Sequence, residues 1–122
     1  MSESEDWSLD GRRAHPAFRS SVPRPVAFDR RELDAILRVY GRKVSEGEWR
    51  DYAIDHLHDR AVFSIFRRAS EMPMFRVEKM PALARKQGAY RVVAASGAIL
   101  KRGHDLAAVL RVLEKPKLSL VN

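Results

Sequence analysis

The side chains with the clearest capacity for chemistry are arginines and lysines concentrated between residues 60 and 102. This stretch holds ten Lys or Arg and two acids, Glu71 and Glu78, so its net charge of +8 exceeds the +7 of the whole chain. A guanidinium group binds phosphate through two parallel N–H groups, and a cluster of them attracts nucleic acid, an anionic membrane or an acidic protein. The candidate binding residues are Arg67, Arg68, Arg76, Arg85, Lys86, Arg91, Lys101 and Arg102.

Aromatic side chains lie among these cations, at Phe63, Phe66, Phe75 and Tyr90. Rings on an exposed sheet face would stack on unpaired bases, as in sheets that bind RNA or single strands. Successive side chains of a strand point to opposite faces, so the same rings fit equally well in a core beneath a solvated basic surface. On the nucleic-acid interpretation, four arginines should be exposed on one surface: Arg67, Arg68, Arg91 and Arg102.

The histidines are the group most typical of an enzyme. His56 and His58 lie two residues apart, Asp55 and Asp59 flank them, and His104 is a third imidazole. Two imidazoles and a carboxylate can hold zinc or iron. Asp59 is better explained as a turn residue, and histidines near a hairpin turn are often solvated. The three histidines are therefore weak candidates for metal ligands, and we expect no cofactor.

Other catalytic motifs are missing from the sequence. It contains no GxxxxGK[ST] or GxGxxG phosphate loop and no GxSxG turn. It contains no cysteine, which excludes disulfides, thiolate zinc sites and a thiol nucleophile. Ser64 is predicted to lie in the middle of a strand, a poor place for a nucleophile. We therefore expect the protein not to be an enzyme.

The elements that position these residues occupy one predicted domain. Residues 1–25 hold four acids, four arginines and three prolines without helical or strand periodicity, and we expect a disordered tail there. A single domain is predicted over 26–115, followed by a C-terminal tail over 116–122. A chain of 122 residues is long enough for one domain.

Two helices are predicted, one at each end of this domain. Asp29 and Glu32 have the spacing of a capping box, and Gly47 marks where the first helix should end. Asp105 should begin the last helix, and Pro116 should end it. The apolar stripes of the two helices are Leu33, Ile36, Leu37, Tyr40 and Val44 in the first, and Leu106, Val109, Leu110 and Leu113 in the second.

Five strands are predicted between the helices. They cover residues 49–57, 61–68, 74–79, 90–95 and 98–102. Ser96-Gly97 is a two-residue hairpin turn that would pair Val93 with Leu100, and a second hairpin should turn at Asp59-Arg60. The predicted fold class is α+β, an antiparallel meander of about five strands with an N-terminal and a C-terminal helix packed on one face.

Two long segments carry a resemblance to a known family. They run from FDRRELDAILRVYGRKVSEGEWRDYAIDHLHDRAVFSIFRRASEMP through YRVVAASGAILKRGHDLAAVLRVL, within residues 26–114. The chain resembles an uncharacterised alphaproteobacterial family, domain of unknown function 2794. The resemblance implies a bacterial, cytoplasmic origin. It implies no activity, cofactor or site residue.

The sequence favours a small non-enzymatic binding module with a basic surface. Nucleic acid, as RNA or a single strand, is the first ligand we expect, and an adaptor role with an acidic protein partner is the alternative. A histidine-based metalloenzyme is a remote third. The acidic N-terminus resembles no secretory signal, and no apolar run could span a bilayer, so we expect a cytoplasmic protein. The sequence predicts no oligomeric state.

Overall fold

The computed structural model describes residues 24–68 and 71–114. The predicted N-terminal tail lies outside the described residues except for Arg24 and Pro25. The predicted C-terminal tail lies wholly outside them.

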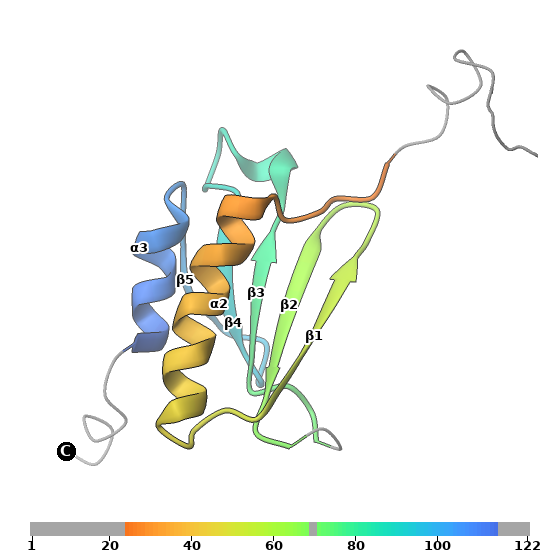
Figure 1. Ribbon diagram of the computed structural model, residues 1–122. Helices are drawn as coiled ribbons and strands as arrows, with labels where there is room; N and C mark the ends of the chain where they lie inside the picture. Colours follow the sequence, from red (N-terminus) through yellow and green to blue (C-terminus); the bar gives the residue numbers. More distant parts are fainter. Residues whose placement is uncertain (1–23, 69–70, 115–122) are drawn as a thin grey trace, which may run out of the picture.

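Five antiparallel strands form one sheet, and in the chain one helix precedes the strands and another follows them (Figure 1). The sheet order follows the sequence order, so each strand pairs with its neighbour in the chain. The predicted five-stranded antiparallel sheet with an N-terminal and a C-terminal helix is confirmed. The elements are α2 (Arg30–Ser45), β1 (Asp51–His56), β2 (Ala61–Phe66), β3 (Phe75–Lys79), a 3-10 turn (Pro81–Leu83), β4 (Tyr90–Ala94), β5 (Ile99–Gly103), α3 (Leu106–Leu110) and a final 3-10 turn (Arg111–Glu114).

The predicted capping box begins α2. The Asp29 carboxylate accepts a hydrogen bond from the Glu32 amide at 2.8 Å, and the Glu32 carboxylate accepts one from the Asp29 amide at 2.7 Å. The buried stripe of α2 differs from the prediction at its end. Val39 is buried, whereas Val44 is 41% exposed.

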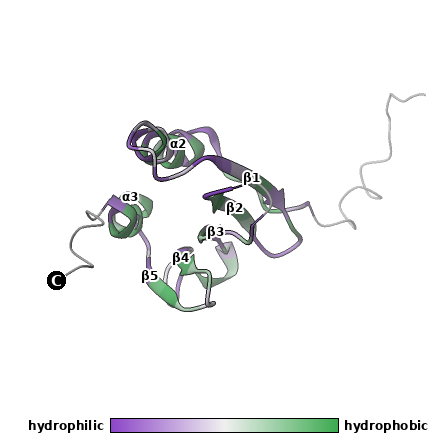
Figure 2. Ribbon diagram, turned by 90° about the horizontal axis from the view of Figure 1, so that it is seen from below, coloured by the Kyte–Doolittle hydropathy of each residue, from purple (hydrophilic) through white to green (hydrophobic). Residues whose placement is uncertain are grey.

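The core lies between the helices and alternate residues of the central strands. Ile36 of α2 and Val109 of α3 share one buried cluster with Phe63, Val77 and Val92. Figure 2 shows α2 and α3 on the same side of the sheet. Because side chains alternate along a strand, Val62, Ser64, Arg76, Glu78, Arg91, Val93 and Arg102 project to the other side, here called the outer face.

The β4–β5 hairpin turns at the predicted position but pairs in a different register. Gly97 has a φ of 95°, and the Ala94 amide donates to the Ala98 carbonyl at 2.9 Å. Val93 pairs with Ile99, and Val92 pairs with Lys101, so Leu100 is the extra residue of a β-bulge. The predicted pairing of Val93 with Leu100 was therefore wrong.

Candidate functional site: an arginine cluster on the outer face

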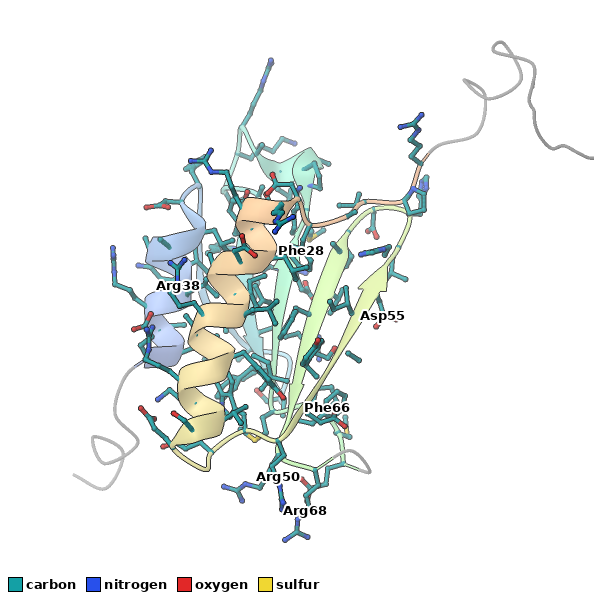
Figure 3. The ribbon with its side chains drawn as sticks, viewed as in Figure 1. Phe28, Arg38, Arg50, Asp55, Phe66 and Arg68 are labelled. Carbon is teal, nitrogen blue, oxygen red and sulfur yellow. The ribbon has the colours of Figure 1, made fainter. Side chains whose placement is uncertain are left out.

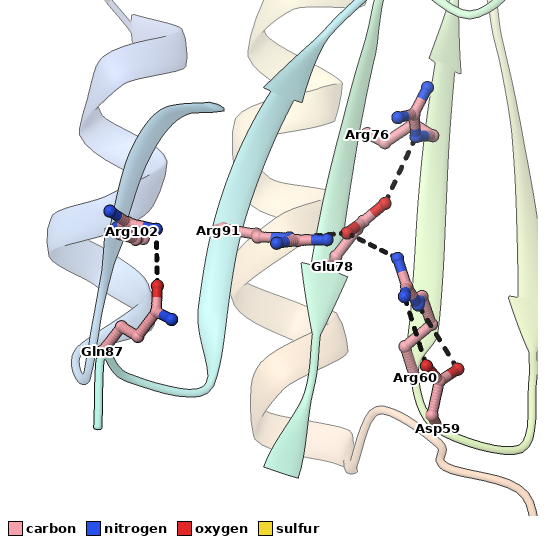
Figure 4. Close-up of polar contacts among 7 residues, drawn as sticks. All are labelled: Asp59, Arg60, Arg76, Glu78, Gln87, Arg91 and Arg102. Atoms are coloured by element: carbon pink, nitrogen blue, oxygen red, sulfur yellow. Dashed lines mark hydrogen bonds and ion pairs between the residues drawn. The ribbon is translucent and has the colours of Figure 1, made fainter. Parts of the chain in front are cut away.

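The outer face carries a buried carboxylate that binds three arginines. Glu78 on β3 is 3% exposed. Its Oε1 accepts from Arg91 Nε at 2.7 Å and from Arg60 Nη1 at 3.3 Å, and its Oε2 accepts from Arg76 Nε at 3.3 Å (Figure 4). A charge removed from water needs such partners. Glu78 therefore fixes three guanidinium groups on one face of the sheet.

Strand register brings these side chains together. Arg91 on β4 lies directly opposite Glu78, and Arg76 precedes Glu78 by two residues on the same strand face. Val62 on β2 is the other partner of Glu78, and Arg60 precedes Val62 by two residues. Strands β3 and β4 and the residue just before β2 therefore supply the three guanidinium groups that bind Glu78.

Arg60 is held from a second side by its neighbour Asp59. Its Nη2 lies 3.2 Å from Asp59 Oδ2, and its Nε lies 3.3 Å from Oδ1. The hydrogen bonds from Arg60 hold the pKa of Asp59 below its ordinary value, and those same bonds raise the pKa of Arg60. Arg60 therefore stays charged and is fixed between two carboxylates.

Strand β5 supplies a fourth arginine. Arg102 lies directly opposite Arg91, is exposed, and donates from Nη1 to Gln87 Oε1. We call Arg60, Arg76, Arg91 and Arg102 with Glu78 the arginine cluster. Three of the guanidinium groups bind the carboxylates of Glu78 and Asp59, and with Arg102 the four arginines exceed these two carboxylates by two positive charges. Such an excess on a fixed surface can bind an anion.

Three of the eight predicted binding residues belong to this cluster: Arg76, Arg91 and Arg102. Arg67 and Arg68 follow the far end of β2, about 17 Å along the strand from Val62 at 3.3 Å per residue. Figure 3 shows Arg68 with Arg50 at that end of the sheet. Arg67 and Arg68 therefore lie outside the arginine cluster, near the other end of β2.

Among the described residues, the other predicted residues make none of the side-chain hydrogen bonds of the cluster. Arg85 and Lys86 are exposed in the segment between the first 3-10 turn and β4. Lys101 pairs with Val92, a core residue, so it projects to the helix side. Arg91 was expected to be exposed, but its side chain is only 22% exposed because it binds Glu78.

Sequence reasoning missed Arg60, which had been placed only in a turn. Arg60 lies two residues before Val62, so strand alternation would have placed both side chains on the same face. This spacing indicates a contact with Glu78 only once Glu78 is known to pair with Val62. The missing information was therefore strand register.

The aromatic rings mostly point away from the outer face. Phe63 is fully buried, Phe75 packs against the core cluster, and the Tyr90 hydroxyl binds Glu32. By strand alternation, Phe66 is the aromatic side chain that the described strands present on the outer face, and it is half-buried. The outer face of the described strands therefore carries guanidinium groups but no row of rings on which bases could stack.

A second polar cluster lies beneath the start of α2. Glu32 is 9% exposed and accepts hydrogen bonds from Lys79 Nζ at 2.8 Å, from the Tyr90 hydroxyl and from the Asp29 amide. Burial raises the pKa of Glu32, but the hydrogen bonds from Lys79, Tyr90 and Asp29 outweigh it, so its pKa lies below the ordinary value. Burial and Glu32 raise the pKa of Tyr90. Glu32, Lys79 and Tyr90 therefore provide hydrogen-bond partners for one another, and their bonds join α2 to β3 and β4.

Replacing Glu32 with glutamine should reduce the free energy of unfolding at neutral pH. It should also make that free energy change less as the pH falls into the acidic range. A carboxyl whose folded pKa is lowered stabilises the fold above its unfolded pKa of about 4.3, and this contribution is lost as pH falls through the folded pKa. Loss of charge-assisted hydrogen bonds should cost about 1.5–3 kcal/mol at pH 7. Urea unfolding from neutral to acidic pH measures both effects. Asp34→Asn, which removes a carboxylate from an exposed residue nearby, provides the control. If the stability of Glu32→Gln varied with pH as that of the wild type does, the Glu32 carboxylate would not have this stabilising role.

The predicted histidines do not meet. His56 ends β1, His58 lies in the hairpin after it, and His104 follows β5. The first and last strands of the sheet are separated by four strand spacings, about 19 Å. Among the described residues, no group of three or more potential metal-binding side chains forms.

Comparison with known proteins places the chain in a family. No curated protein and no solved structure matches it. Within the described part of the chain, no helix has the length and apolar character needed to cross a membrane. A family model described as "Protein of unknown function (DUF2794)" matches residues 26–110, which include every strand and both helices. The chain belongs to this family.

Proposed function

We propose that the protein is a non-enzymatic binding module that binds nucleic acid through the arginine cluster of its outer face. The observation that supports this proposal is the set of three guanidinium groups held around buried Glu78, with a fourth, Arg102, directly opposite Arg91 on the next strand. Arginine is well suited to the role because its planar group remains charged and can contact phosphate oxygens in pairs.

Fixed arginines lose less entropy on binding than free ones. Arg76 and Arg91 each use Nε to reach Glu78, and among the described residues their Nη groups have no hydrogen-bond partner. The donors that remain can therefore contact a ligand while the side chain stays in place. Such preorganisation favours affinity because ordering costs have already been met in folding.

The orientation of the rings favours recognition of phosphate over bases. Without a row of exposed aromatic side chains, affinity should come from the backbone charge of the nucleic acid. Binding should then depend steeply on salt and weakly on base sequence. This differs from the single-strand preference that the sequence suggested.

Fluorescence anisotropy with labelled duplex DNA and single-stranded RNA tests the proposal. We expect affinity in the micromolar range at low salt, falling as salt rises from about 50 to 200 mM. The double variant Arg76→Gln/Arg102→Gln should bind more weakly and reduce the slope of log affinity against log salt by about 2, since each phosphate contact contributes about one.

A control with the same net charge separates the cluster from bulk attraction. The double variant Arg30→Gln/Arg38→Gln changes exposed residues of α2, in the helical layer (Figure 3). Its salt slope should stay near that of the wild type. No binding at low salt would reject the proposal and direct the search to an acidic protein partner, and equal losses in the two double variants would reject the cluster as the binding site.

A further inference from the structure

Within the arginine cluster, Arg91 and Arg102 form a pair that folding alone does not explain. They lie directly opposite each other on β4 and β5 and on the same face. Like charges in directly opposite positions destabilise a sheet. Arg91 has Glu78 to compensate its charge, whereas Arg102 has only the neutral Gln87 among the described residues. The positive charge of Arg102 therefore lies where repulsion from Arg91 destabilises the pairing of β4 with β5.

The two side chains are anchored on different sides. Arg91 donates through Nε to Glu78 on β3, and Arg102 donates through Nη1 to Gln87, which precedes β4 (Figure 4). A guanidinium group has five N–H donors, so each arginine retains four after its anchoring bond. Among the described residues, none of these remaining donors has a hydrogen-bond partner.

We infer that Arg91 and Arg102 together bind one phosphate group on the outer face. Directly opposite residues of antiparallel strands have Cα atoms about 5 Å apart, so two arginine side chains can reach the oxygens of one phosphate. The bound anion would compensate the positive charge of the arginine cluster that Glu78 does not neutralise. Gln87 and Glu78 would keep both guanidinium groups oriented. Naming a nucleic-acid phosphate as the natural ligand rests on the proposed function.

The site is tested with inorganic phosphate on the full chain. NMR signals of the arginine Nε–Hε groups are followed as sodium phosphate is added, with sodium chloride at equal ionic strength as the reference. We expect saturable shifts at Arg91 and Arg102 with phosphate and not with chloride. Arg102→Gln should weaken phosphate binding about five-fold or more, because it removes one of two charged contacts.

Two further variants show whether position or charge matters. Arg38→Gln removes the same charge from an exposed residue of α2 and should leave phosphate affinity unchanged. Gln87→Ala keeps both arginines but removes the anchor of Arg102, so it should weaken binding by less than Arg102→Gln. Shifts that grow without saturation, or equal losses in Arg38→Gln and Arg102→Gln, would overturn the site.

This experiment separates the site from the proposed function. If phosphate binds at the pair but neither nucleic acid binds, the site stands and the proposed function fails. If nucleic acid binds but phosphate does not shift Arg91 and Arg102, the site fails and the proposed function stands.

Discussion

Replacement of Gly88 with alanine is expected to unfold most of the protein. Gly88 is buried with a φ of 94°, a backbone conformation that side chains disfavour. A Cβ atom there would lie 2.1 Å from the Gly103 carbonyl carbon and oxygen and 2.6 Å from the His104 amide nitrogen. All three are backbone atoms at or just after the end of β5, so relieving the clash requires a backbone shift in β5 or in the segment that carries Gly88. The loss should exceed about 4 kcal/mol, a large part of the stability of a small domain.

A second glycine supplies the control for this substitution. Gly97 has nearly the same φ, 95°, but a Cβ there would meet nothing within 4 Å. Gly97→Ala should therefore cost only the backbone strain, about 1–2 kcal/mol. Urea unfolding followed by circular dichroism measures both variants. Equal stability of Gly88→Ala and Gly97→Ala would show that the segment before β4 does not pack closely against β5.

Glu78→Gln should produce the second large effect. Glutamine has nearly the same shape but lacks the charge, so three guanidinium groups would surround a buried neutral amide. Removing one partner of a buried ionic cluster typically costs about 3–5 kcal/mol. Urea unfolding at neutral pH measures this loss. Added phosphate should restore more stability to Glu78→Gln than to the wild type, because the unpaired guanidinium groups gain an anion.

Glu71 provides the matched control for the loss of a carboxylate. It is exposed, so Glu71→Gln should change the free energy of unfolding by no more than about 0.5 kcal/mol. If Glu78→Gln behaved like Glu71→Gln, the carboxylate would not organise the arginines. The binding proposal would then lose its preorganised surface.

The parts of the fold that the sequence predicted depend on residues close together in the chain. The capping box needs only Asp29 and Glu32, and the Ser96-Gly97 turn needs only four residues. Alternating apolar residues were enough to predict five strands. The β-bulge at Leu100 was missed because nothing in the local pattern of 98–102 distinguishes a bulged strand from a regular one.

The candidate site was predicted only in part because it depends on strand register. Charge density grouped Arg67 and Arg68 with Arg91, although the sheet separates them along its length. Strand alternation could have excluded Lys101, but only with the pairing of β4 and β5 known. The partners of Glu32 lie 47 and 58 residues further along the chain, at Lys79 and Tyr90, beyond the reach of any local pattern.

The order of strands in the sheet also bears on how the chain reaches its fold. Because every strand pairs with its neighbour in sequence, the sheet can grow by successive hairpins, each of which closes a short loop at small entropic cost. The bonds from Glu32 to β3 and β4 close much longer loops. The meander can therefore form early, while docking of α2 through Glu32 contributes later in folding, when its partner strands are already side by side.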